Sequence, residues 1–120
     1  MVIPVQVTFR NMSTSDALEA AIREKAAKLD RLHPRIIMGC RIAVEAERHR
    51  HMRGSLFRVR IDLTVAQGEL VASGNTTQPA PHENVYLAVN EAFDEVRRQL
   101  EDHAQRLRGE VKAHGARRTG

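Results

Sequence analysis

The chain has 120 residues, of which 42% are hydrophobic and only 3% aromatic, and its formal net charge is +4. This length suits one domain with a modest core, and the hydrophobic content excludes a disordered chain. The single cysteine, Cys40, excludes an intramolecular disulfide, and its apolar surroundings predict a buried, inert thiol. No apolar run approaches the roughly 20 residues that span a bilayer. The first residues lack a signal-peptide pattern, so a cytoplasmic protein is expected.

The first third of the chain predicts a strand and then a helix. Residues 5–10 alternate apolar and polar side chains, which is typical of a strand. Ser15 is a good N-cap and Asp16 favours the first helical turn. The helix should end near Leu32, because the residue before Pro34 is pushed out of the helical region. The expected buried stripe of this helix consists of Leu18, Ala21, Ile22, Ala26, Leu29 and Leu32.

Three more strands are predicted in the middle of the chain. Residues 36–47 and 56–65 alternate strongly, and residues 69–73 should pair with the latter as a hairpin through a turn at Gln67-Gly68. In residues 36–47, one face is expected to hold Met38, Cys40, Ile42, Val44 and Ala46. In residues 56–65, the apolar face is expected to hold Phe57, Val59, Ile61, Leu63 and Val65.

A long amphipathic helix is predicted over residues 84–108, after a loop that begins at Gly74. Tyr86 and Phe93 are expected to pack in the core, and Gly109 is expected to break the helix. Residues 1–110 should form the domain, followed by a basic, disordered tail at 111–120. The apolar positions that define the helix are 85, 89, 92, 93, 96, 100 and 107.

These elements predict an α+β fold of order β-α-β-β-β-α, with a four-stranded sheet and two helices packed on one face. The other face should be solvated, which explains the clean alternation of the strands. That bare face is expected to carry Arg58 and Arg60. A basic domain with two helices edged by Lys and Arg suits the phosphates of a nucleic-acid backbone.

The chain resembles the short, single-domain form of the bacterial ribosome hibernation-promoting factors and ribosome-associated translation inhibitors, over residues 4–108. The resemblance rests on the order and spacing of several short segments on this element sequence. They are Ser15-Asp16-Ala17-Leu18, Lys25-Ala26-Ala27-Lys28-Leu29, Glu69-Leu70-Val71-Ala72-Ser73, and Val85-Tyr86-Leu87-Ala88-Val89 followed by Asp94, Arg98-Gln99-Leu100 and His103.

The resemblance implies binding in the decoding channel of the small ribosomal subunit. There such a protein occludes messenger and transfer RNA and suppresses translation in stationary phase or stress. The implied partner is ribosomal RNA, contacted through phosphates, with no cofactor, no metal, no membrane and no small-molecule substrate. The implied protein is not an enzyme, and the chain also lacks a glycine-rich phosphate loop.

The resemblance places RNA contacts on both helices. The matching basic positions are Lys25 and Lys28 on the first helix and Arg98 and Arg106 on the second. The family usually has lysines where this chain has Glu95, Asp102 and Ala104, and Arg97 and Arg108 compensate in part for that lost charge. Further candidate contacts are Arg58 and Arg60 of the bare sheet face and Arg50 of the Arg/His-rich turn at residues 48–53.

Other interpretations remain open at this point. The turn at residues 48–53 can contact phosphate or be merely solvated, and His49 with His51 can begin a metal site only if further ligands approach. Tyr86 can stack on a base instead of packing in the core. The protein can also be a homodimeric protein-interaction module or a general double-stranded RNA-binding domain.

Overall fold

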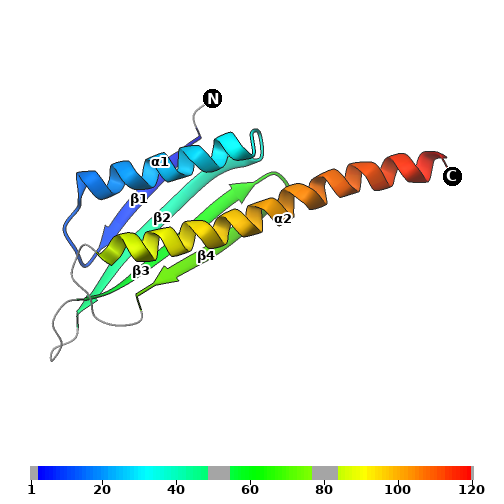
Figure 1. Cartoon of the computed structure of the whole chain (residues 1–120). Coiled ribbons are helices and arrows are strands. Elements are labelled where there is room, and N and C mark those ends of the chain that lie inside the picture. The colour runs from blue at the N-terminus through cyan, green and yellow to red at the C-terminus, as the bar shows by residue number, and fades with distance from the viewer. Residues whose placement is uncertain (1–2, 49–54, 77–83, 120) are drawn as a thin grey trace.

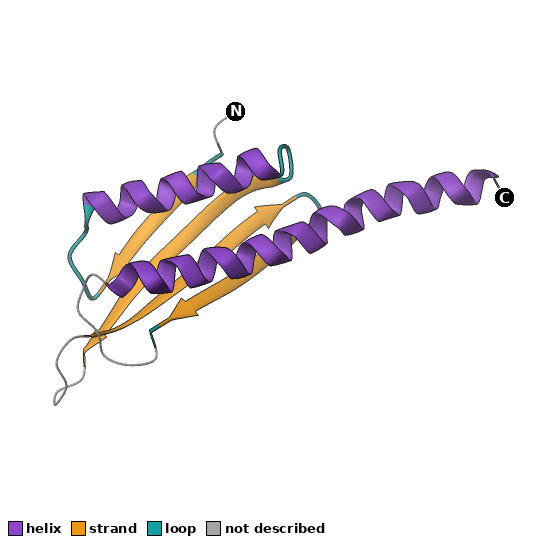
Figure 2. Ribbon diagram, viewed as in Figure 1, coloured by secondary structure: helices purple, strands orange, loops and turns teal. Residues whose placement is uncertain are grey.

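The computed structural model describes residues 3–48, 55–76 and 84–119. The described part has the predicted order β-α-β-β-β-α, and Figure 1 shows the arrangement of its elements. Both helices cover one face of a four-stranded sheet and leave the other face bare (Figure 2). The elements are β1 (Val5–Arg10), α1 (Asp16–Leu32), β2 (Ile37–Arg48), β3 (Ser55–Val65), β4 (Gly68–Asn75) and α2 (Val85–Thr119).

The strands lie in the order β1-β2-β3-β4, so the sheet has free edges at β1 and β4. Strand β1 runs parallel to β2, because α1 carries the chain back across the sheet between them. The other neighbours are antiparallel, and a tight turn at Ala66 and Gln67 joins β3 to β4. Gln67 has φ 63°, a left-handed conformation suited to such a turn. The predicted α+β fold is therefore confirmed.

Local sequence signals explain the limits of α1. The Ser15 side chain accepts a hydrogen bond from the Leu18 backbone N–H at 3.2 Å, as expected of an N-cap. At the other end, the His33 backbone N–H donates to the Leu29 carbonyl at 3.1 Å, and Pro34 follows. Both predicted ends of this helix are confirmed.

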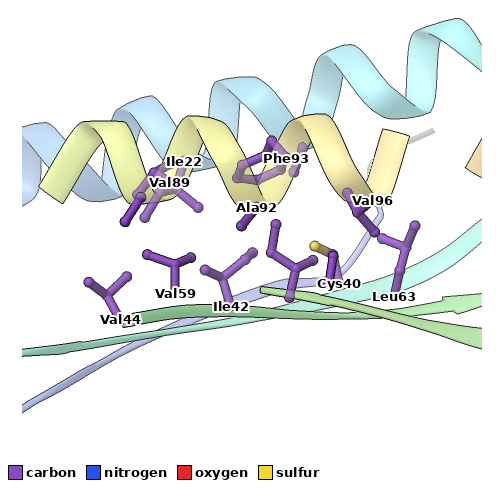
Figure 3. Close-up of a cluster of buried hydrophobic side chains, with 14 of the residues drawn as sticks. Ile22, Cys40, Ile42, Val44, Val59, Leu63, Val89, Ala92, Phe93 and Val96 are labelled. Atoms are coloured by element: carbon purple, nitrogen blue, oxygen red, sulfur yellow. The ribbon is translucent and has the colours of Figure 1, made fainter. Parts of the chain in front are cut away.

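The core lies between the sheet and the two helices. Alternate residues of β3 from Phe57 to Val65 are at most 2% exposed, as predicted from their spacing. Figure 3 shows Val89, Ala92 and Val96 of α2 above the inward-facing side chains of β2 and β3. Phe93 is also buried, at 6% exposure, which confirms its predicted place in the core.

Two apolar residues predicted to be buried are exposed instead. Met38 is 62% exposed, because the register of β2 against β3 shifts between Ile37 and Gly39 and turns Ile37 inward in its place. Leu32 is 59% exposed, since it is the last residue of α1, where the helix runs out over the end of the core. The alternation of a strand does not reveal such a bulge. The apolar stripe of a helix likewise does not reveal where the sheet beneath it ends.

Gly74 was predicted to begin the loop after the fourth strand, but it belongs to β4. It lies directly beneath α2: a Cβ at this position would overlap the Ala88 carbonyl oxygen and lie 2.7 Å from the Ala92 nitrogen. Ala88 and Ala92 are themselves small and fully buried. Helix and strand therefore approach each other more closely than any side chain at residue 74 would allow.

Helix α2 continues through Gly109 to Thr119, so the break predicted at Gly109 is wrong. A single glycine inside a helix costs only about 1 kcal/mol relative to alanine, which does not by itself end it. The last turns project well beyond the sheet (Figure 1), and the molecule measures 67 × 28 × 16 Å. The division into a domain of residues 1–110 and a tail of residues 111–120 stays a prediction.

Candidate nucleic-acid interface

The structure distributes the nine predicted RNA-contacting residues over separate surfaces. Six lie on the helices, and Arg58 and Arg60 lie on the bare face of the sheet. Arg50 and the histidines beside it fall outside the described residues. The helical residues are Lys25, Lys28, Arg97, Arg98, Arg106 and Arg108.

Lys25 and Lys28 lie on the flank of α1 that faces α2. Arg23 marks the opposite flank, because its guanidinium Nη1 donates to the Val5 carbonyl at 3.0 Å, at the free edge of β1. At 100° per residue, Lys25 and Lys28 fall on the other side of the buried stripe that includes Ile22. The two helices lie side by side and run in the same direction (Figure 1), so this flank faces α2.

On α2, Arg97 faces α1 and Arg98 does not. The Gln99 side chain donates to the Val71 carbonyl at 3.0 Å, which fixes its flank of α2 over the free edge of β4. Arg97, 200° away around the helix, therefore lies on the flank toward α1. Arg98 pairs with Glu95 at 2.9 Å, an ion pair that partly satisfies its charge. Of these neighbouring arginines, the resemblance matched Arg98, but the geometry places Arg97 with Lys25 and Lys28.

Two of the departures from the family pattern have different structural settings. Ala104 is 1% exposed, so a lysine would have to displace core packing to stand there in this chain. Asp102 is exposed, as are most of the acidic residues of the first five turns of α2. In residues 85–105 these acidic residues outnumber Arg97 and Arg98; they are Glu91, Asp94, Glu95, Glu101 and Asp102.

His103 holds α2 on the sheet. Its Nε2 lies 2.7 Å from the Ala66 carbonyl oxygen, a hydrogen bond to the β3–β4 turn, and its Cε1 would contact a Cβ at Gly68. The half-buried ring is therefore used in docking helix to hairpin. Sequence analysis matched this histidine to the family without finding that role, because its partner lies 37 residues away along the chain.

The two arginines on the bare face of the sheet are each paired with an acid. Arg58 lies 3.3 Å from Glu47, and Arg60 contacts Asp62 at 3.1 Å. They lie on the opposite side of the sheet from the helices, so they cannot contact one flat surface together with Lys25 and Lys28. A shallow hollow on this face is lined by Arg10, Ala43, Glu45, Arg58, Val59, Arg60, Ser73 and Asn75.

Two further residues were singled out by the sequence. Cys40 is buried at 3% exposure, and burial, with a smaller contribution from the charge of Asp62, raises the pKa of its thiol to about 12. The prediction of an unreactive thiol is consistent with this setting. Tyr86 was expected to pack against the sheet, but its neighbour Val85 fills that place and Tyr86 is 37% exposed on the first turn of α2.

The fold defines a small α+β domain with two helices on one face of a four-stranded sheet. Residues 5–108 match the family described as "Sigma 54 modulation protein / S30EA ribosomal protein", and the chain belongs to this family. The resemblance to the hibernation-promoting factors is thereby confirmed. The family consists of ribosome-associated modulation proteins and is not a family of enzymes.

Solved structures with the same fold include proteins from Thermus thermophilus and Coxiella burnetii. The N-terminal domain of Thermus thermophilus Protein Y is 20% identical, with a TM-score of 0.60 over 86% of this chain and 99% of that one. A ribosomal subunit interface protein from Coxiella burnetii is 16% identical, with a TM-score of 0.63 over 84% of this chain and 97% of that one. A search of curated protein sequences found no match. Within the described residues, no helix is both long and apolar enough to cross a membrane.

Proposed function

We propose that this protein binds the small ribosomal subunit in its decoding channel and suppresses translation in stationary phase or stress. It acts in the cytoplasm by occupying the path of messenger and transfer RNA, not by catalysis. Family membership supports the ribosome as partner. The chemistry of the helical face supports RNA phosphates as the contacted groups.

The observation that carries this proposal is a set of cations on the facing flanks of the two helices. Lys25 and Lys28 on one side and Arg97 on the other lie on facing flanks of two helices held by a common sheet. Within the described part of the chain, none of the three is held in an ion pair, whereas Arg58, Arg60 and Arg98 are. Their charges are therefore available to phosphates without first breaking an internal pair.

Phosphate contacts have to supply most of the binding energy. The chain is 3% aromatic and has no tryptophan, so base stacking contributes little; Tyr86 is the one aromatic side chain exposed among the described residues. Contacts to phosphate displace condensed counterions, so binding should weaken steeply as salt rises. A rigid sheet behind both helices keeps the cations in place and reduces the entropy lost on binding.

The structure favours this function over a homodimer formed through sheet edges. Each free edge carries a helix side chain on an edge carbonyl: Arg23 on Val5 of β1 and Gln99 on Val71 of β4. Such covering opposes the addition of a strand from another chain. A homodimer through another surface would appear as a second sedimenting species in the experiment below.

The test is sedimentation of the full chain with ribosomal subunits on sucrose gradients, at low and at high salt. Co-migration with the small subunit, lost at high salt, is expected. Lys25→Glu with Lys28→Glu should abolish co-migration without changing the urea midpoint of unfolding, because both side chains lie at the helix surface. A protein that stays at the top of the gradient at low salt would refute the proposed function.

A matched pair of variants separates the two faces. Lys25→Gln with Lys28→Gln and Arg58→Gln with Arg60→Gln each remove two positive charges, the first from the helical face and the second from the bare sheet face. We expect the first pair alone to lower the slope of log binding constant against log salt by about 2. If both double variants lower this slope equally, binding depends on net charge alone and not on the face that carries it. Competition by an RNA hairpin as strong as by subunits would favour a general double-stranded RNA binder.

A further inference from the structure

The positive charge of this chain is concentrated in one segment. We call residues 106–119 the distal α2 and residues 85–105 the proximal α2. The distal α2 contains five basic residues and one acidic residue, Glu110, for a net charge of +4. Residues 1–105 contain fourteen basic and fourteen acidic residues, so the rest of the chain is neutral overall. The basic residues of the distal α2 are Arg106, Arg108, Lys112, Arg117 and Arg118.

The distal α2 extends away from the folded body. At about 1.5 Å per residue its fourteen residues extend about 21 Å, and Figure 1 shows this part of the helix beyond the end of the sheet. Arg106 and Arg108 are exposed, and a Cβ at Gly109 would meet nothing within 4 Å. The helix is therefore unpacked at Gly109, and the cations of Arg106 and Arg108 are open to a partner.

The composition of this segment identifies the chemistry of that partner. After Leu107 its one large apolar residue is Val111, so the segment has no apolar stripe to bury in a protein groove or a bilayer interface. It contains Gly109 and Gly115, and isolated helices shorter than about 12–15 residues are marginal in water. Phosphates along the segment would offset the repulsion between its cations and favour the helix.

We propose that the distal α2 is a second phosphate-binding element, which lies along an RNA backbone beyond the facing helix flanks that hold Lys25, Lys28 and Arg97. This inference rests on the proposed function, because the RNA would be that of the small subunit. It assigns the long-range attraction to the distal α2 and the positioning to those three residues. It also explains how the acidic proximal α2 is tolerated: the charge missing there is supplied farther along the same helix.

The test compares two variants of the full chain that each lose three positive charges. The first is Lys112→Gln/Arg117→Gln/Arg118→Gln in the distal α2. The control is Arg10→Gln/Arg41→Gln/Arg58→Gln on the bare face of the sheet. Binding to purified small ribosomal subunits, and separately to an RNA hairpin, is measured by fluorescence anisotropy over a range of salt concentrations.

The distal variant should lower the slope of log binding constant against log salt by about 2, and the control should leave it unchanged. Amide hydrogen exchange at residues 109–119 should slow when subunits bind the unsubstituted chain. Equal slopes for the distal variant and the unsubstituted chain on subunits would overturn this inference and leave the proposed function intact. In another outcome, the chain does not bind subunits, and the slope of log binding constant against log salt on the hairpin falls only in the distal variant. This outcome would overturn the proposed function and leave phosphate binding by the distal α2 intact.

Discussion

The two parts of α2 belong to one continuous helix but are held by different forces. The proximal α2 is packed into the core: Val89, Val96 and Leu100 are all fully buried. It is also tied to the hairpin by Gln99 and His103. The distal α2 continues the same backbone past the sheet, with open space around Gly109, and it carries a charge of the opposite sign.

Within this one helix, the proximal α2 serves mainly stability and the distal α2 mainly binding. A helix face that must bury apolar area against a sheet has few positions left for cations, and here those positions are largely acidic. Beyond the sheet Arg106 and Arg108 are exposed, so basic residues stand there at little cost to stability. The proximal α2 should therefore respond to substitution through unfolding, and the distal α2 through binding.

The largest expected effect is that of Leu100→Ala in the proximal α2. Leu100 is 0% exposed, and its truncation should lower the free energy of unfolding by about 4 kcal/mol through lost burial and a residual cavity. Leu107→Ala is the matched control, because Leu107 is only half-buried where the helix leaves the sheet, and it should cost less than about 1 kcal/mol. Urea unfolding followed by circular dichroism measures both. Similar losses would show that packing extends into the distal α2.

The next effect contrasts two glycines. Gly74→Ala should destabilise the protein by about 3 kcal/mol, because the new methyl group meets the backbone of Ala88 and Ala92 and the helix must move. Gly109→Ala adds the same methyl group in open space, and should stabilise the local helix by about 1 kcal/mol. Urea midpoints report the first change, and hydrogen exchange at residues 109–119 reports the second. A tolerated Gly74→Ala would contradict the close approach of β4 and α2.

The last effect is confined to alkaline pH and concerns the core beneath the proximal α2, where Cys40 lies (Figure 3). Its folded-state pKa of about 12 exceeds the ordinary 9.0, so above pH 9 the unfolded chain loses a proton that the folded chain retains. The thiol's contribution to stability is thus complete below pH 9 and is lost between pH 9 and 12. The loss should approach 1.4 kcal/mol for each pH unit.

Cys40→Ala supplies the control, because other groups also titrate in this range. The unfolding free energy of the unsubstituted chain should fall more steeply above pH 9 than that of the variant. Identical slopes would mean that the thiol is not held in its neutral form by the fold. A thiol-specific reagent at pH 8 should likewise react only after urea unfolding, since Cys40 is 3% exposed.

Much of the fold could be predicted because its signals are local. The alternation of Phe57 to Val65 follows from the pleat of a strand, and the cap at Ser15 involves a partner three residues away. Some errors arose where a distant contact decides, as at Met38, which is turned outward by a bulge against β3. The error at Tyr86 has a local reason: Tyr86 lies 100° around the helix from Val85, outside the buried stripe that the helical period predicts.

The sequence by itself determined the order of the elements, the buried face of nearly every strand, and the presence of basic residues on both helices. These follow from periods of 2 and 3.6 residues, which do not depend on the rest of the chain. The tertiary structure alone decided which cations share a surface. It paired Arg58, Arg60 and Arg98 with acids, set Arg97 on the flank of α2 that faces Lys25 and Lys28, and used His103 for docking. The sequence gives the number and sign of the charges, but the distances between them are set by the packing of elements far apart along the chain.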